Sequence, residues 1–151
     1  MNRRASVLHE FENIETELGF ITTLLRKQQV EELDGIEIRA AALSLSTIYN
    51  GIEKVLLHVL RRQNNESTLG PNWHADLLAR CSKAHVISKE TTNKLKGFMA
   101  FRHFVRHAYS FEIDAVTIRE IIKECPALVT QLKREIQLSI NEKGSETDGK
   151  D

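Results

Sequence analysis

Apolar residues recur at helical spacing along most of the chain, and no segment alternates at the period of two that marks a half-buried strand. Steps of three and four residues predict four main helices and a shorter one that carries Trp73, Leu77 and Leu78. The four main apolar stripes are Phe11, Ile14, Leu18, Ile21 and Leu25; Leu45, Ile48, Ile52, Val55 and Val59; Leu95, Phe98, Phe101 and Val105; and Ile118, Ile122, Val129, Leu132 and Ile136. The pattern predicts an all-α fold, an antiparallel bundle of four to five helices.

Polar residues next to these stripes predict where the helices begin. The second helix is expected to start near Asp34–Gly35, and the candidate N-cap residues of later helices are Asn72, Ser88 and Asp114. Residues 61–72 contain Asn, Ser, Gly and Pro, so they predict a loop. Pro126 lies inside the last stripe, where it removes a backbone donor, and we expect a kink or a short break near Cys125.

Composition limits the class of protein. The chain has 151 residues, of which 41% are apolar, and this suits one domain over residues 1–140. Residues 141–151 contain no apolar residue and are expected to form a disordered tail. Basic and acidic residues number 21 each, so any contact with nucleic acid must come from a local patch. We see no membrane-length apolar run and no secretion signal, which favours the cytoplasm.

Cysteine and histidine spacing gives little support for a metal site. Cys81 and Cys125 are too few and too scattered for a disulfide framework or a zinc site, and we expect buried thiols in a reducing compartment. His103 and His107 have the H-x3-H spacing that can bind zinc on a helix. However, Phe104 occupies the position where such motifs carry Glu, and no third ligand is evident. No metal and no cofactor are therefore expected.

The decapeptide "FRHFVRHAYS", residues 101–110, concentrates unusual chemistry. Guanidinium binds phosphate through a planar donor fork, and imidazole transfers protons near neutral pH. RNA carries its own nucleophile, the 2′-hydroxyl beside each phosphate. Cleavage therefore needs at least one base, one acid and one cation that stabilises the charge on the phosphoryl group. On a regular helix over 98–109, Arg102 and His107 diverge by roughly 140°. Their cooperation would need an irregular helix or a second subunit, and spacing alone favours an ion-pairing surface.

The decapeptide also matches R-x4-H-x-Y, with Arg102, His107 and Tyr109 in the three fixed places. It resembles the HEPN superfamily, and specifically the HepT-like ribonuclease toxins of prokaryotic toxin–antitoxin pairs. The segments 39–56, 72–78 and 101–114 occur in the order that these proteins show. The resemblance spans most of the chain except the tail.

The resemblance implies a fold, an activity and a partner. The protein would be a homodimeric, metal-independent endoribonuclease, the toxin of a type VII-like system, with RNA as its substrate. Arg102 would stabilise the scissile phosphate, and His107 would act as general base or acid. Tyr109 would receive adenylate from an MNT-type nucleotidyltransferase antitoxin, and the two proteins would assemble into a larger toxin–antitoxin hetero-oligomer. A negatively charged adduct beside the arginines would compete with RNA phosphate.

Four nearby residues have two interpretations each. His103 is interpreted as an auxiliary RNA contact rather than as a catalyst, and Arg106 as either a second phosphate contact or a surface charge. Asn50 and Glu53 lie close to the second apolar stripe, where they either orient the arginine through a buried bridge or face solvent. Tyr109 itself has an alternative, which is to end the apolar stripe by packing against the core.

Two other functions remain open on the same residues. One is a catalytically inactive HEPN module that binds nucleotide or docks a partner. The other is a helical dimerisation module whose decapeptide only binds anions. RNA cleavage in the presence of a chelator separates the ribonuclease from both.

Overall fold

The computed structural model describes residues 2–27, 32–62, 70–109 and 112–145. Within these ranges it contains helices and no strand, so the all-α prediction is confirmed. The helices are α1 (Arg3–Lys27), α2 (Gly35–Arg62), α3 (Trp73–Lys83), α4 (Lys89–His107) and α5 (Ala115–Ser145). None of the described helices is long and apolar enough to cross a membrane.

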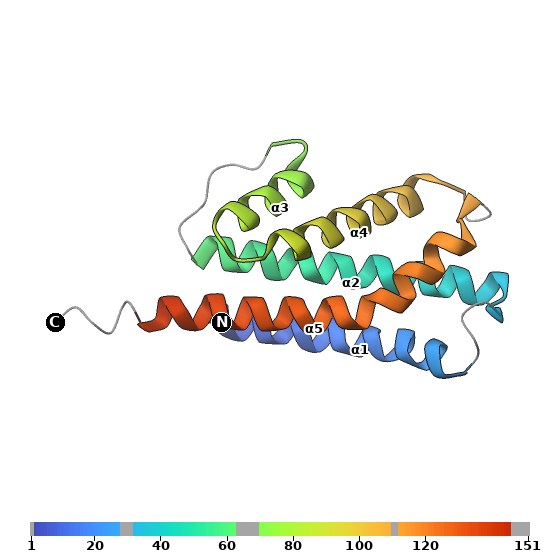
Figure 1. Ribbon diagram of the computed structural model, residues 1–151, viewed down its shortest axis with the longest axis horizontal. Coiled ribbons are helices and arrows are strands. Elements are labelled where there is room, and N and C mark those ends of the chain that lie inside the picture. Colours follow the sequence, from blue (N-terminus) through green and yellow to red (C-terminus); the bar gives the residue numbers. More distant parts are fainter. Residues whose placement is uncertain (1, 28–31, 63–69, 110–111, 146–151) are drawn as a thin grey trace.

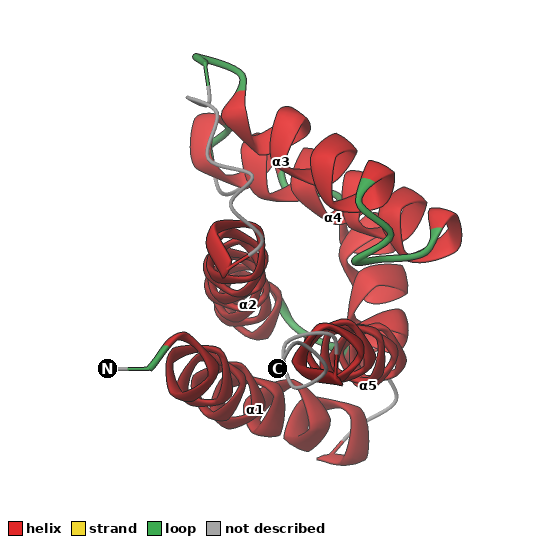
Figure 2. Ribbon diagram, turned by 90° about the vertical axis from the view of Figure 1, so that its left-hand side faces the viewer, coloured by secondary structure: helices red, strands yellow, loops and turns green. Residues whose placement is uncertain are grey.

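The long helices form an up-and-down arrangement, in which α1 and α4 run opposite to α2 and α5 (Figure 1). Figure 2 shows that α2 lies between α1 on one side and the α3–α4 pair on the other. The short helix α3 packs on both α2 and α4, and α5 packs on α1, α2 and α4. As a result, α2 contributes side chains both to the face that packs on α1 and to the face that packs on α3 and α4.

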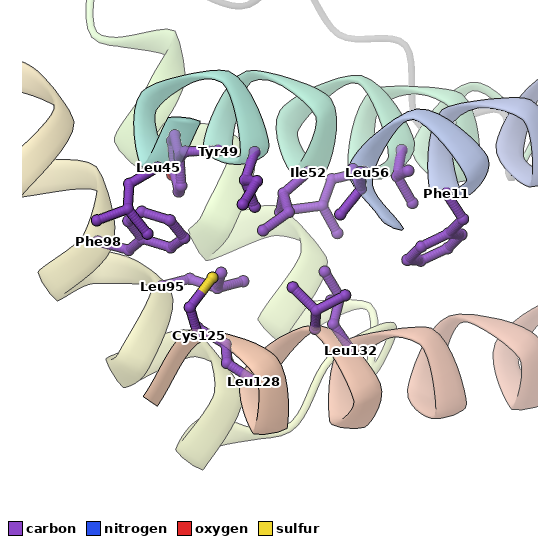
Figure 3. Close-up of a cluster of buried hydrophobic side chains, with 14 of the residues drawn as sticks. Phe11, Leu45, Tyr49, Ile52, Leu56, Leu95, Phe98, Cys125, Leu128 and Leu132 are labelled. Atoms are coloured by element: carbon purple, nitrogen blue, oxygen red, sulfur yellow. The ribbon is translucent and has the colours of Figure 1, made fainter. Parts of the chain in front are cut away.

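The core follows the apolar stripes. Every member of the α2 and α5 stripes is buried, while Leu18 and Leu25 of the α1 stripe and Val105 of the α4 stripe are only partly buried. Figure 3 shows side chains from α1, α2, α4 and α5 meeting in one cluster around Leu95 and Ile52. Cys81 and Cys125 are both buried in this core and free. Burial raises the pKa of each thiol to about 12, because a thiolate would lose its hydration there.

Three of the predicted helix starts agree with the structure, and one cap does not. The Ser88 hydroxyl accepts from Thr91 N at 3.1 Å, and Asp114 accepts from Val116 N at 3.0 Å. Asp34 accepts from Glu37 N at 2.8 Å at the start of α2. Each bond satisfies a backbone donor that the helix leaves unpaired. The prediction for Asn72 was right in position only, because its side chain makes no capping hydrogen bond.

The last helix runs further than the sequence suggested. It passes through Pro126 without a break, but its early part lies oblique to the straight later part, as Figure 1 shows. The expected kink is therefore present and the break is not. The helix also continues to Ser145, into the segment 141–151 predicted as a tail, and residues 146–151 lie outside the described residues. Of the loop predicted at 61–72, the first two residues belong to α2, and 63–69 lie outside the described residues.

Candidate active site

Arg102 lies at the junction between α4 and the middle of α2. Its side chain is half-buried, and its Nε donates a hydrogen bond to Asn50 Oδ1 at 2.6 Å. This contact joins residues 52 positions apart and turns the guanidinium toward α2. The two Nη groups make no hydrogen bond with any described residue, which leaves the bidentate edge of the fork for a ligand. Asn50 does bridge to the arginine, as one of its two interpretations had it, but the residue is exposed, so the bridge is not a buried one.

The two histidines lie side by side at the exposed end of α4. The ring centroids of His103 and His107 are 4.5 Å apart, and the rings are tilted by 54°. Both residues are exposed, as is Arg106, which shares the last turn of the helix with His107. Cationic groups in this position interact favourably with the helix dipole. The arrangement puts two proton-transfer groups within one turn of each other on a solvent-exposed surface.

Tyr109 is not part of the helix. The sequence-based geometry assumed a regular helix over 98–109, and this is wrong at its end because α4 stops at His107. Ala108 is extended, with ψ 154°, and its N–H makes the closing bond to Phe104 O at 2.8 Å. Tyr109 is therefore 72% exposed rather than packed at the end of the apolar stripe. The alternative in which it belongs to the core is wrong.

A buried polar pair lies beneath this surface, and the sequence did not identify it. Glu53 is only 3% exposed, and one of its oxygens pairs with His74 Nδ1 at the start of α3. The His74 ring also stacks on Trp73, at 3.7 Å between centroids. The expectation that Glu53 would bridge to the arginine or face solvent is thus corrected. The available signal was a carboxylate and an imidazole on otherwise apolar faces of two helices, because buried charges are normally paired.

Tyr49 separates the buried pair from the arginine. It is fully buried and meets Phe98 edge to face at 5.4 Å between centroids. Burial raises the pKa of Tyr49 strongly, and the Glu53 carboxylate raises it further, while Arg102 acts in the opposite direction. This phenol therefore stays protonated at neutral pH. Among the described residues its hydroxyl has no hydrogen-bond partner.

The described ranges bring together no group of three or more His, Cys, Asp or Glu side chains that could hold a metal ion. The structure pairs Arg102 with Asn50 and His103 with His107, and among the described residues no contact joins the two pairs. Such a set can bind a phosphate and move protons beside it.

A helical bundle with this segment at the end of one helix has the features of a HEPN protein. Residues 40–141 match a model of the HepT-like protein family. The chain therefore belongs to the HepT-like family of the HEPN superfamily. The match covers α3, α4 and most of α2 and α5, and leaves out α1. No curated protein and no solved structure matches the chain.

Proposed function

We propose that this protein is the toxin of a type VII-like toxin–antitoxin pair, an endoribonuclease that cleaves RNA without a metal ion. The observation that carries the proposal is the Arg102–Asn50 hydrogen bond beside two exposed imidazoles. A guanidinium held by its Nε keeps a fixed orientation. A fixed guanidinium binds phosphate better than a mobile one, so this geometry favours a phosphate contact over a simple surface charge as the role of Arg102. Family membership supports the toxin context.

The chemistry follows from the groups available. His107 removes the proton from the ribose 2′-hydroxyl, and the oxygen attacks the adjacent phosphorus. Arg102 stabilises the charge that develops on the phosphoryl oxygens. The bond from phosphorus to the 5′-oxygen breaks, and a protonated imidazole returns a proton to that oxygen. The products are a 2′,3′-cyclic phosphate and a free 5′-hydroxyl.

The active form is proposed to be a homodimer with the ends of the two α4 helices in one cleft. A two-fold axis would supply a second His107 and a second Arg102, which provides the acid and the base from identical residues. Phe104, an apolar side chain within the motif, is 42% exposed, which fits a surface that becomes covered. Light scattering that shows only a monomer at micromolar concentration would count against this arrangement.

Purified protein with RNA and excess chelator provides the test of the ribonuclease. We expect cleavage to continue in EDTA and the products to end in 2′,3′-cyclic phosphate. Loss of cleavage on chelation would favour a metal-dependent reaction. Intact RNA under every condition would instead favour the inactive HEPN module that binds nucleotide or docks a partner.

Tyr109 is proposed as the acceptor of adenylate from an MNT-type nucleotidyltransferase antitoxin. Its exposure and its position beyond the helix end make the hydroxyl accessible to a second enzyme. With the antitoxin, ATP and magnesium, wild-type protein should gain ~329 Da per adenylate, the mass of a phosphodiester-linked AMP, and lose cleavage. Tyr109→Phe keeps the ring and lacks the acceptor, so it should gain no mass and remain active. A mass shift that persists in Tyr109→Phe would assign the modification to another residue.

A further inference from the structure

A polar groove of about 410 Å³ lies between α1 and α2, next to the arginine site. Glu10, Asn13 and Glu17 line it from α1, and Asn50 and Lys54 line it from α2. The α1 side of the groove lies outside residues 40–141, the part of the chain that matches the family. The groove thus extends the proposed active site with a surface that residues 40–141 do not form by themselves.

Close packing of the two helices forms the groove. Gly51 on α2 faces Ile14 on α1, and a Cβ added to Gly51 would lie 2.7 Å from Ile14 Cγ1. Only glycine allows this approach, so the two backbones come close while the polar side chains line the opening above them. Both Gly51 and Ile14 line the groove.

Three of the seven polar side chains that line the groove are unpaired within the described residues, whereas Thr16 and Thr47 donate to carbonyl oxygens of their own helices. Glu10, Asn13 and Lys54 make no hydrogen bond or ion pair with any described residue. Glu17 uses one oxygen to accept from Ser44 at 2.9 Å and keeps the other. The groove therefore offers carboxylate acceptors, an amide and an ammonium donor that are not already satisfied.

Asn50 connects the groove to the site of cleavage. Its oxygen accepts from Arg102, and its amide nitrogen is left to donate to a ligand. A phosphate bound to the guanidinium of Arg102 would bring the neighbouring nucleotide of the same RNA strand to the groove. The occupant would thus be a nucleotide adjacent to the scissile bond.

The charges indicate which part of that nucleotide enters. Two carboxylates and one ammonium leave a net negative charge, which disfavours a second phosphate. A nucleobase instead presents donors and acceptors together. Guanine has two adjacent N–H groups that match the two oxygens of a carboxylate, and O6 and N7 acceptors that match lysine. We propose that the groove is a guanine-binding subsite that selects where the RNA is cut. This inference rests on the proposed ribonuclease function.

Short RNAs that differ only in the bases flanking one cleavage site provide the test. Wild-type protein should cut beside guanine about tenfold faster than beside other bases, the discrimination of one good base contact. Asn13→Ala and Lys54→Ala should each remove most of this preference. Asn141→Ala and Lys89→Ala delete the same groups at exposed positions outside the groove, and both should keep the preference.

The outcomes separate the two proposals. If the wild-type protein cuts none of the RNAs, the ribonuclease proposal fails and the subsite fails with it. If it cuts them, but without a guanine preference or with one that the groove variants retain, only the subsite is overturned. Light scattering on the same variants adds a second readout. A shift of Lys54→Ala to a smaller species would mean that the groove binds a second copy of the chain instead of RNA.

Discussion

The first half of α4 is held by its neighbours, whereas the second half presents its side chains to solvent. At the start, Ser88 N and Thr91 Oγ1 both donate to Glu135 of α5, at 2.7 and 2.6 Å. Leu95 and Phe98 follow in the core. From Arg102 to the end of the helix at His107, Arg102 and Val105 are partly buried and the other four residues are exposed.

The difference shows how one helix serves two purposes. The anchored half fixes the position and direction of the helix in the bundle. In the exposed half, the hydrogen bond from Arg102 to Asn50 then orients the guanidinium. Groups that bind RNA, as proposed for this half, cannot also be buried, and a rigid element is the better support for them. Substitutions in the two halves should therefore separate stability from activity.

The largest effects are expected from the exposed half. His107→Ala should lower RNA cleavage about 10²- to 10⁴-fold, because it removes the group that transfers the proton. Arg102→Ala should lower it about 10²- to 10³-fold, because charge on the phosphoryl group loses its stabilising donor. Single-turnover cleavage rates measure both, and thermal unfolding should stay within a few degrees of wild type. A large fall in stability for either variant would contradict the proposed separation.

The anchored half should respond in the opposite way. Phe98→Ala empties a position that is 3% exposed and removes the edge contact with Tyr49, and should cost about 3–5 kcal/mol of unfolding free energy. Phe104→Ala is the matched control on the same helix. At 42% exposure it should cost less than about 1 kcal/mol within the protomer. Urea unfolding at two protein concentrations distinguishes this cost from a contribution of the dimer.

A smaller effect is expected where α4 is tied to α5. Glu135→Ala removes the acceptor for both Ser88 N and Thr91 Oγ1, and should cost about 1–2 kcal/mol. Glu124→Ala, which removes an exposed carboxylate from the same helix, is the control and should be close to neutral. Equal losses in the two variants would mean that the contact to α4 contributes nothing.

The smallest effect concerns pH and the start of α5. Hydrogen bonds from the Thr117 hydroxyl and then from Val116 N lower the pKa of the Asp114 carboxyl. Its contribution to stability is therefore present above the ordinary pKa of aspartate and is lost as pH falls through the lowered value. Asp114→Ala should reduce Tm slightly at neutral pH and by less in acid. A reduction that grows in acid would have the wrong sign and would refute the assignment.

Local sequence determined the helices and much of their boundaries. Spacing of apolar residues placed the buried faces of α2 and α5, and hydroxyl and carboxylate side chains placed the starts of α4 and α5. These features depend on residues within one or two helical turns, so they can be predicted from one amino-acid sequence. The candidate residues of the decapeptide were also selected in this way, through the types of side chain and the resemblance they carry.

Tertiary structure alone decided which polar groups meet. Asn50 binds Arg102 from 52 positions away, and Glu53 pairs with His74 although it lies only one turn beyond Asn50 on the same helix. Spacing cannot predict such partners because they depend on how whole helices are placed against each other. The same holds for Tyr109, whose exposure follows from where α4 ends, and for the groove, which exists because Gly51 lets α1 approach α2. Local periodicity selects the faces of helices, and long-range packing selects the neighbours of each face.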